Sequence, residues 1–252
     1  MRLLVALVIF FITPEFNGQD KSIEDLDSEY GLPILITEEE KKRALQKKRS
    51  KVLTQSVARK VTRIVEAFDE AGVAEDKKAI ILKSNDYSNA EKEQESKVLD
   101  KEIKTAVAKA QKEINELKEK INSLKSYDRS MVWYYQGYIN LVYADNLAGA
   151  RENYLSLIAE EDATPQIKLG SYYTVSQLYL ADEDFTNGIK YLLEWFKKSP
   201  EVTAQAYVLL GQAYFLLDEH EKAFSNLYKA KTITEEEGAL FRENWYSLLI
   251  AT

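Results

Sequence analysis

Residues 204–230, AQAYVLLGQAYFLLDEHEKAFSNLYKA, decide how this chain is interpreted. Small and aromatic residues recur in them at offsets that suit two antiparallel helices, and Gly211 and Ala223 allow the two backbones to approach closely. The turn between the helices is expected at residues 218–220. Large residues fill the space around the crossing, and the pattern is completed by Tyr207, Leu210, Tyr214, Leu227 and Ala230.

The same spacing occurs twice more upstream, so the pattern is an internal repeat. One copy, 35 positions earlier, consists of Tyr172, Val175, Ser176, Tyr179, Phe185, Gly188, Leu192, Trp195 and Pro200. Another consists of Trp133, Gln136, Gly137, Ala150, Tyr154 and Leu157, with a turn that is one residue longer. These residues resemble the tetratricopeptide repeat, whose helix-turn-helix units stack into a solenoid and need about three copies for stability.

A fourth unit is expected to begin at residues 242–245. Its first helix carries Trp245, Leu248, Leu249 and Ile250. Because the terminal caps of solenoids have a polar outer face, this apolar helix favours a fourth repeat whose second helix lies beyond Thr252.

The resemblance implies a protein-binding groove lined by the first helix of each pair. Carried over by spacing, the lining residues are Tyr134, Tyr138, Leu141, Tyr173, Gln177, Gln205, Val208, Gln212 and Phe215. This lining is rich in aromatic and amide groups. Tyrosine, which is favoured at protein interfaces, is concentrated in the same region, with 14 of its 16 copies from Tyr127 onward.

Residues 37–126 predict long amphipathic helices ahead of the repeats. The capping-box spacing of Thr37 and Glu40 predicts a helix from Glu38. Apolar residues then recur at helical spacing from Val57 to Ala71, and Gly72 is expected to end that helix. The apolar run 79–82 is expected to form a second, short helix, followed by a turn at residues 84–89.

Residues 91–125 are rich in Lys, Glu and Ala and carry a heptad pattern, which predicts a coiled-coil-like helix. Its seam is Ile103, Val107, Ala110, Ile114, Leu117, Ile121 and Leu124. The favoured interpretation is an antiparallel hairpin with the preceding long helix, which has a free apolar face of matching length. The alternative is a docking helix for another chain, including self-association through residues 91–125.

The N-terminus has the order of an export signal. One positive charge, Arg2, precedes about ten apolar residues, which is too short for a membrane span and suits a secretory signal peptide over residues 1–18. Residues 19–36 are expected to form an extended arm. The protein is therefore expected to be exported, and to be associated with membranes only through its partners.

The sequence offers no constellation that suggests catalysis, a cofactor or a metal site. The chain has no cysteine, and its single histidine, His220, cannot build a catalytic triad or a metal cluster alone. From Tyr127 onward 18 Asp and Glu residues outnumber 10 Lys and Arg residues. Residues 41–63 hold ten basic residues and no acidic one. We interpret that block as a solvated helix face and expect no nucleic acid partner.

Several segments also resemble the exported tetratricopeptide proteins encoded beside TonB-type energy-transduction genes in marine gamma-proteobacteria. They are residues 126–133, SYDRSMVW; 170–181, GSYYTVSQLYLA; 194–197, EWFK; 209–214, LLGQAY; and 243–245, ENW. The resemblance covers about half of the chain. It implies a periplasmic location and a part in coupling inner-membrane energy transduction to outer-membrane transport of iron or other nutrients.

The sequence therefore predicts an all-α protein in which a tetratricopeptide solenoid over residues 127–252 follows coiled-coil-like helices over residues 37–126. The expected function is a non-catalytic protein–protein scaffold in the bacterial envelope, with subunits of a TonB complex as expected partners. Two alternatives stay open: an adaptor for envelope assembly or secretion, and a structural coiled-coil protein that oligomerises.

Overall fold

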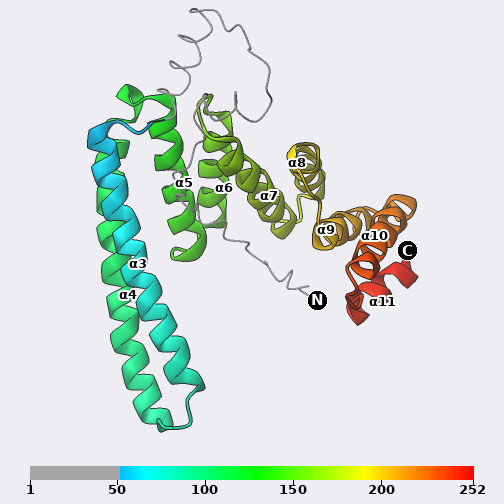
Figure 1. The fold of residues 1–252 in the computed structure, drawn as a ribbon, viewed down its shortest axis with the longest axis horizontal. Helices are drawn as coiled ribbons and strands as arrows, with labels where there is room; N and C mark the ends of the chain where they lie inside the picture. The colour runs from blue at the N-terminus through cyan, green and yellow to red at the C-terminus, as the bar shows by residue number, and fades with distance from the viewer. Residues whose placement is uncertain (1–51) are drawn as a thin grey trace, which may run out of the picture.

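The computed structural model describes residues 52–252, and every regular element in that range is a helix, as the predicted all-α class requires (Figure 1). The signal peptide, the extended arm and the helix start at Glu38 lie outside the described residues. The helices are α3 (Gln55–Lys83), α4 (Asn89–Lys118), α5 (Ser126–Val142), α6 (Leu147–Ala159), α7 (Pro165–Ala181), α8 (Phe185–Lys198), α9 (Ala204–Phe215), α10 (His220–Glu236) and α11 (Glu243–Ala251), with a short 3-10 helix at Ile121–Ser123.

α3 and α4 form a long antiparallel hairpin, because each has one apolar face along its length. Two ion pairs between the helices define how they align: Glu70 with Lys109 at 2.7 Å and Lys78 with Asp100 at 2.6 Å. The predicted hairpin is confirmed. The buried residues between the helices are Val57, Val61, Ile64, Ala67, Ala71 and Ala74 on α3, and Leu99, Ala106, Ala110, Ile114 and Leu117 on α4.

Three details of this region were predicted wrongly. Gly72 does not end the helix, because α3 continues through it to Lys83. The run 79–82 is the last turn of α3 and not a separate helix. α4 ends at Lys118, so Ile121 and Leu124, the last two residues of the predicted heptad seam, lie in the 3-10 helix and the turn that follows.

Two basic residues in the described part of the basic block, Lys60 and Arg63, pair with α4. Glu113 accepts hydrogen bonds from Lys60 at 2.9 Å and from Arg63 at 3.0 Å, and Lys60 also pairs with Glu116. These two basic side chains therefore help to join the two helices of the hairpin.

The hairpin packs onto α5 through a shared apolar cluster that includes Val57, Ile64, Ile114, Val132 and Tyr135. A polar contact adds to this junction. The Asp128 carboxylate, with only 1% of its surface exposed, accepts hydrogen bonds from the backbone N–H of Thr54 at 2.9 Å and from its hydroxyl at 2.5 Å. The start of α3 is thereby fixed to the start of α5.

Helices α5 to α10 form three consecutive antiparallel pairs, α5–α6, α7–α8 and α9–α10. In each of the three pairs a glycine lies at the close approach. A Cβ at Gly137 would lie 3.1 Å from the Tyr154 ring, one at Gly188 would lie 2.6 Å from Leu180 Cγ, and one at Gly211 would lie 2.7 Å from Leu227 Cγ. The predicted small residues at the crossings are confirmed in all three copies.

The three intra-pair turns share one backbone form. Each has an acidic residue with positive φ just before the next helix cap: Asp145 at 49°, Glu183 at 61° and Asp218 at 57°. The next residue donates its backbone N–H to a carbonyl oxygen of the preceding helix. Asp184 and Glu219 donate to the residue five positions earlier, whereas Asn146 donates to the residue six positions earlier. The first turn is therefore one residue longer, as predicted. Repeated turn geometry keeps successive pairs similar in shape.

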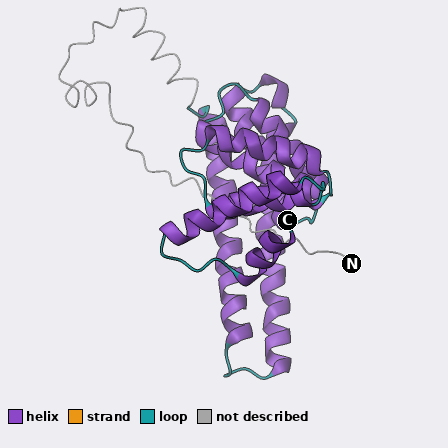
Figure 2. Cartoon of the chain, turned by 90° about the vertical axis from the view of Figure 1, so that its right-hand side faces the viewer, coloured by secondary structure: helices purple, strands orange, loops and turns teal. Residues whose placement is uncertain are grey.

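α11 closes the described chain. Trp245 and Phe241 pack with Val208, Leu227 and Ala230 in one apolar cluster with α9 and α10. Seen from the side, the hairpin extends well beyond the level of the shorter helices (Figure 2). The molecule thus has a compact row of short helices with a long hairpin at one end (Figures 1 and 2).

Candidate interaction surfaces

The predicted lining residues on α5 lie close to α3 and to their own helix pair. The ring of Tyr138 meets Phe68 of α3 edge-on, with centroids 4.9 Å apart. Tyr134 packs edge-on against Tyr154 of α6 at 6.5 Å, and Leu141 is buried. On α5, little of the predicted lining is therefore free for a partner.

The predicted residues on α7 are also engaged within the fold. Tyr173 packs against Trp195 of α8 with ring centroids 5.0 Å apart, and burial raises the pKa of its phenol. Gln177 is buried. Truncating Tyr173 would therefore disturb the core as well as any binding surface.

The predicted residues on α9 contribute most to the surface. Gln205 is exposed, Gln212 and Phe215 are half-buried, and Val208 is buried. Residues 205 and 212 are seven positions apart and 212 and 215 are three apart, so the three side chains share one helix face. The Phe215 ring meets His220 edge-on at 5.6 Å, which gives the single histidine an aromatic packing partner. We call Gln205, Gln212 and Phe215 the α9 face.

A cluster at the junction of α3 and α5 was not predicted from the sequence. Tyr143 lies parallel to Phe68 with centroids 6.2 Å apart, and edge-on to Tyr138 at 5.9 Å. Burial raises the pKa of Glu75, while a hydrogen bond with Tyr143 opposes that rise. Burial also raises the pKa of the phenols of Tyr138 and Tyr143. No sequence pattern could have found the cluster, because it depends on α3 packing over α5.

Large exposed apolar side chains gather at the two ends of the described chain, and residues 99–215 expose none. At the C-terminal end the rings of Phe224 and Tyr228 stack on α10 with centroids 5.9 Å apart. The exposed set there is Leu216, Leu217, Phe224, Tyr228, Leu240, Tyr246 and Ile250. The set on and beside the hairpin is Val52, Val65, Val73, Ile80, Leu82, Tyr87 and Val98.

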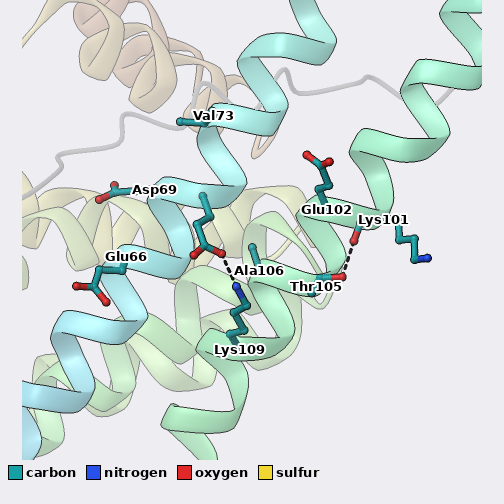
Figure 3. A pocket seen from close by; sticks show the side chains of 9 residues that line it. Glu66, Asp69, Val73, Lys101, Glu102, Thr105, Ala106 and Lys109 are labelled. Atoms are coloured by element: carbon teal, nitrogen blue, oxygen red, sulfur yellow. Dashed lines mark hydrogen bonds and ion pairs between the residues drawn. The ribbon is translucent and has the colours of Figure 1, made fainter.

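A hollow of about 800 Å³ lies between α3 and α4 (Figure 3). Its apolar residues are Val73, which is exposed, and Ala106, which is buried. The ion pair of Glu70 and Lys109 spans it, and Thr105 donates to the Lys101 carbonyl at its side. Its other lining residues are Glu66, Asp69 and Glu102.

Other polar groups serve the packing of the fold. Glu160 accepts hydrogen bonds from Arg129 at 2.8 and 2.7 Å and from Trp133 at 3.1 Å. Gln111 of α4 and Gln136 of α5 exchange amide hydrogen bonds at 2.9 and 3.1 Å. These contacts join neighbouring helices.

Within residues 52–252, no group of three or more His, Cys, Asp or Glu side chains is arranged to hold a metal ion. None of the helices in that range combines the length and apolar character needed to span a membrane. Comparison with protein-family models, with curated proteins and with solved structures finds no match for this chain.

Proposed function

We propose that this protein is a non-catalytic scaffold of the tetratricopeptide type, which binds other proteins through its row of helix pairs. The observation that carries the proposal is the recurrence of a positive-φ acidic residue in the turn of three consecutive helix pairs, each of which has a glycine at its close approach. Repeated pairs of this kind form an extended surface whose residues between the structural positions are available to partners.

The binding surface in this proposal is centred on the α9 face. Gln205 is exposed and Gln212 and Phe215 are half-buried, so they offer amide hydrogen bonds beside an aromatic ring. Interfaces favour this combination of apolar area with hydrogen-bonding groups. The buried or packed positions of the same set, such as Leu141 and Tyr173, would support the helices instead.

The partners in this proposal are subunits of a TonB-type energy-transduction complex in the periplasm, on the resemblance of residues 126–133, 170–181 and 209–214. The scaffold would help to couple that complex to outer-membrane transport. An adaptor for envelope assembly or secretion is the alternative, because the same surface chemistry suits other protein partners.

The test is in-cell crosslinking and affinity purification of the tagged, full-length protein, followed by mass spectrometry. Wild type is compared with the triple variant Gln205→Ala/Gln212→Ala/Phe215→Ala. The double variant Phe224→Ala/Tyr228→Ala is the matched control, because it removes two exposed rings from the neighbouring α10. We expect TonB-complex subunits with wild type and the control, and their loss with the triple variant.

Other outcomes separate the two parts of the proposal. Recovery of different envelope machinery, lost in the triple variant, would reject the TonB assignment and support the adaptor alternative. Equal recovery of partners with wild type and the triple variant would reject the α9 face as the binding surface. Circular dichroism of each purified variant establishes that its helices are intact.

A further inference from the structure

The outer half of the hairpin has little apolar packing of its own. The cluster that joins the hairpin to α5 reaches only to Phe68 on α3 and Val107 on α4. Beyond them the two helices project away from the other helices (Figures 1 and 2). The residues buried there are Ala71, Ala74, Leu99 and Ala106, of which only one is large. Long helices obtain most of their stability from packing an apolar face. Among residues 52–252, little apolar packing supports this half of the hairpin.

An apolar stripe extends from the hollow toward the tip of the hairpin. Val73 and Ile80 are seven residues apart on α3, and therefore lie on one face. Val98 is seven residues before Thr105 of the hollow, so it lies on the same face of α4 as that residue. The exposed fractions of Val73, Ile80 and Val98 are 53%, 68% and 49%. The ion pair of Lys78 with Asp100 places Ile80 and Val98 at about the same height on the two helices.

The two walls of the hollow differ in charge. The charged residues of the α3 wall, Glu66, Asp69 and Glu70, are all acidic, whereas the α4 wall carries Lys101 and Lys109 beside one acid. Figure 3 shows Glu66 and Asp69 directed away from α4, on which Lys101 and Lys109 lie. An acidic wall beside a lysine-bearing wall suits a second copy that places its α4 against this α3.

We propose that a second copy of this chain packs its hairpin on this face, forming a four-helix bundle with the two-fold axis parallel to the helices. That axis places α3 of each copy over α4 of the other. A two-fold axis perpendicular to the helices would instead place the acidic α3 walls of the two copies against each other. Ile80 of each copy then packs against Val98 of the other, and Asp69 faces Lys109 of the other. The proposal does not depend on the α9 face or on the TonB assignment.

The first test measures the association of the full chain by sedimentation equilibrium over a concentration series. Wild type is expected to dimerise. Val73→Glu/Ile80→Glu should raise the dimer dissociation constant at least about tenfold, because each dimer loses two copies of both apolar contacts. Both residues are exposed in the single chain, so the variant should keep its helical circular dichroism. Leu240→Glu, at a side chain that is 94% exposed and outside the hairpin, should associate like wild type.

The second test uses the absence of cysteine from the chain. Two single variants, Ile80→Cys and Val98→Cys, are mixed and oxidised. The proposed axis predicts that mixed disulfide dimers form faster than dimers of either variant alone, and faster than dimers of Leu240→Cys. This test needs no destabilising substitution.

A monomeric wild type across the series would overturn the proposal, as would an unchanged dissociation constant for Val73→Glu/Ile80→Glu. Faster disulfide formation between two Ile80→Cys chains than in the mixture would overturn the proposed axis. Failure of the α9 triple variant to lose partners would leave these measurements unaffected, so the two proposals fail separately.

Discussion

At the residue scale, two glycines in helices have opposite surroundings. Gly211 lies against the partner helix of its pair, where a Cβ would come within 2.7 Å of Leu227 Cγ and 3.2 Å of the Ala223 carbonyl oxygen. Gly72 has no atom within 4 Å of a Cβ position. The first glycine is required by packing, whereas the second only lowers the helix propensity of α3.

The two glycines therefore predict changes of opposite sign. Gly211→Ala should lower the free energy of unfolding by about 1–3 kcal/mol, because Leu227 is fully buried and cannot move aside freely. Gly72→Ala should raise it by about 0.5–1 kcal/mol, because alanine restricts the unfolded chain and favours the helix. Urea unfolding followed by circular dichroism measures both. Destabilisation by Gly72→Ala would show that α3 approaches another surface at this position.

A second residue-scale prediction concerns Glu160, which joins α5 to the end of α6. Burial alone would raise the pKa of Glu160, but hydrogen bonds from Arg129, Trp133 and Ser126 outweigh burial and hold it below the ordinary value of 4.5. Since the carboxylate is favoured in the folded state, its contribution is present above pH 4.5 and is lost as the pH falls through the lowered pKa.

Glu160→Gln should therefore cost about 1–3 kcal/mol of unfolding free energy at neutral pH, because the Arg129 guanidinium loses a charged partner. The difference between variant and wild type should shrink as the pH falls below 4.5. Urea unfolding at a series of pH values measures it. Glu161→Gln, at the exposed neighbouring position, is the control. A difference in unfolding free energy that is constant with pH would mean that the charge of the Glu160 carboxylate does not contribute to stability.

At the scale of elements, the turns between paired helices combine backbone strain with a helix cap. Glu183 has φ of 61°, a conformation that costs a residue with a side chain about 1–2 kcal/mol. The next residue, Asp184, caps α8 by accepting from the backbone N–H of Asn187 at 3.1 Å. Adjacent positions of one turn therefore carry opposite contributions to stability.

Glu183→Gly should raise the unfolding free energy by about 1 kcal/mol, because glycine adopts positive φ without a steric cost. Asp184→Ala should lower it by about 1 kcal/mol through loss of the cap. Thermal unfolding of the two variants beside wild type measures both changes. If both variants were destabilised, the Glu183 side chain would have a stabilising contact that outweighs its backbone strain.

The elements themselves were largely predictable from local patterns, and the exceptions have physical causes. Small and aromatic residues at fixed offsets predicted α5 to α10 and the close approach within each of the three pairs. Gly72 was misjudged because a single helical glycine costs only about 1 kcal/mol, which the buried residues Ala71 and Ala74 beside it offset. The heptad pattern did not show where α4 ends, because Ile121 and Leu124 continue to pack on the same cluster after the helix has stopped.

At the scale of the molecule, the binding face was harder to predict from the sequence than the helices were. The repeat spacing selects a helix face but cannot tell which neighbour covers it. Phe68 of α3 lies against Tyr138, and Trp195 lies against Tyr173, so these two positions are packed while the α9 face is more open. The first contact joins α3 to α5, which are far apart in the sequence, and the second joins α8 to α7.

The outer end of the hairpin gives the last prediction. Residues 77–83 of α3 and 89–95 of α4 contain no buried side chain. Each segment is seven residues long, so removing both moves the turn inward while the apolar faces of the two helices keep their phase. The free energy of unfolding should change by less than about 2 kcal/mol, because no buried residue is lost, although the ion pair of Lys78 with Asp100 and the Ser88 capping box are removed.

The same deletion removes Ile80 while it keeps Glu75, Val98 and the cluster around Val57 and Ile114. Dimerisation should therefore weaken in a protein whose fold is unchanged. Urea unfolding and sedimentation equilibrium on one preparation measure the two properties. A large loss of stability at concentrations where wild type is monomeric would mean that the outer hairpin supports the fold itself, whereas undiminished association would place the contact between copies on another surface.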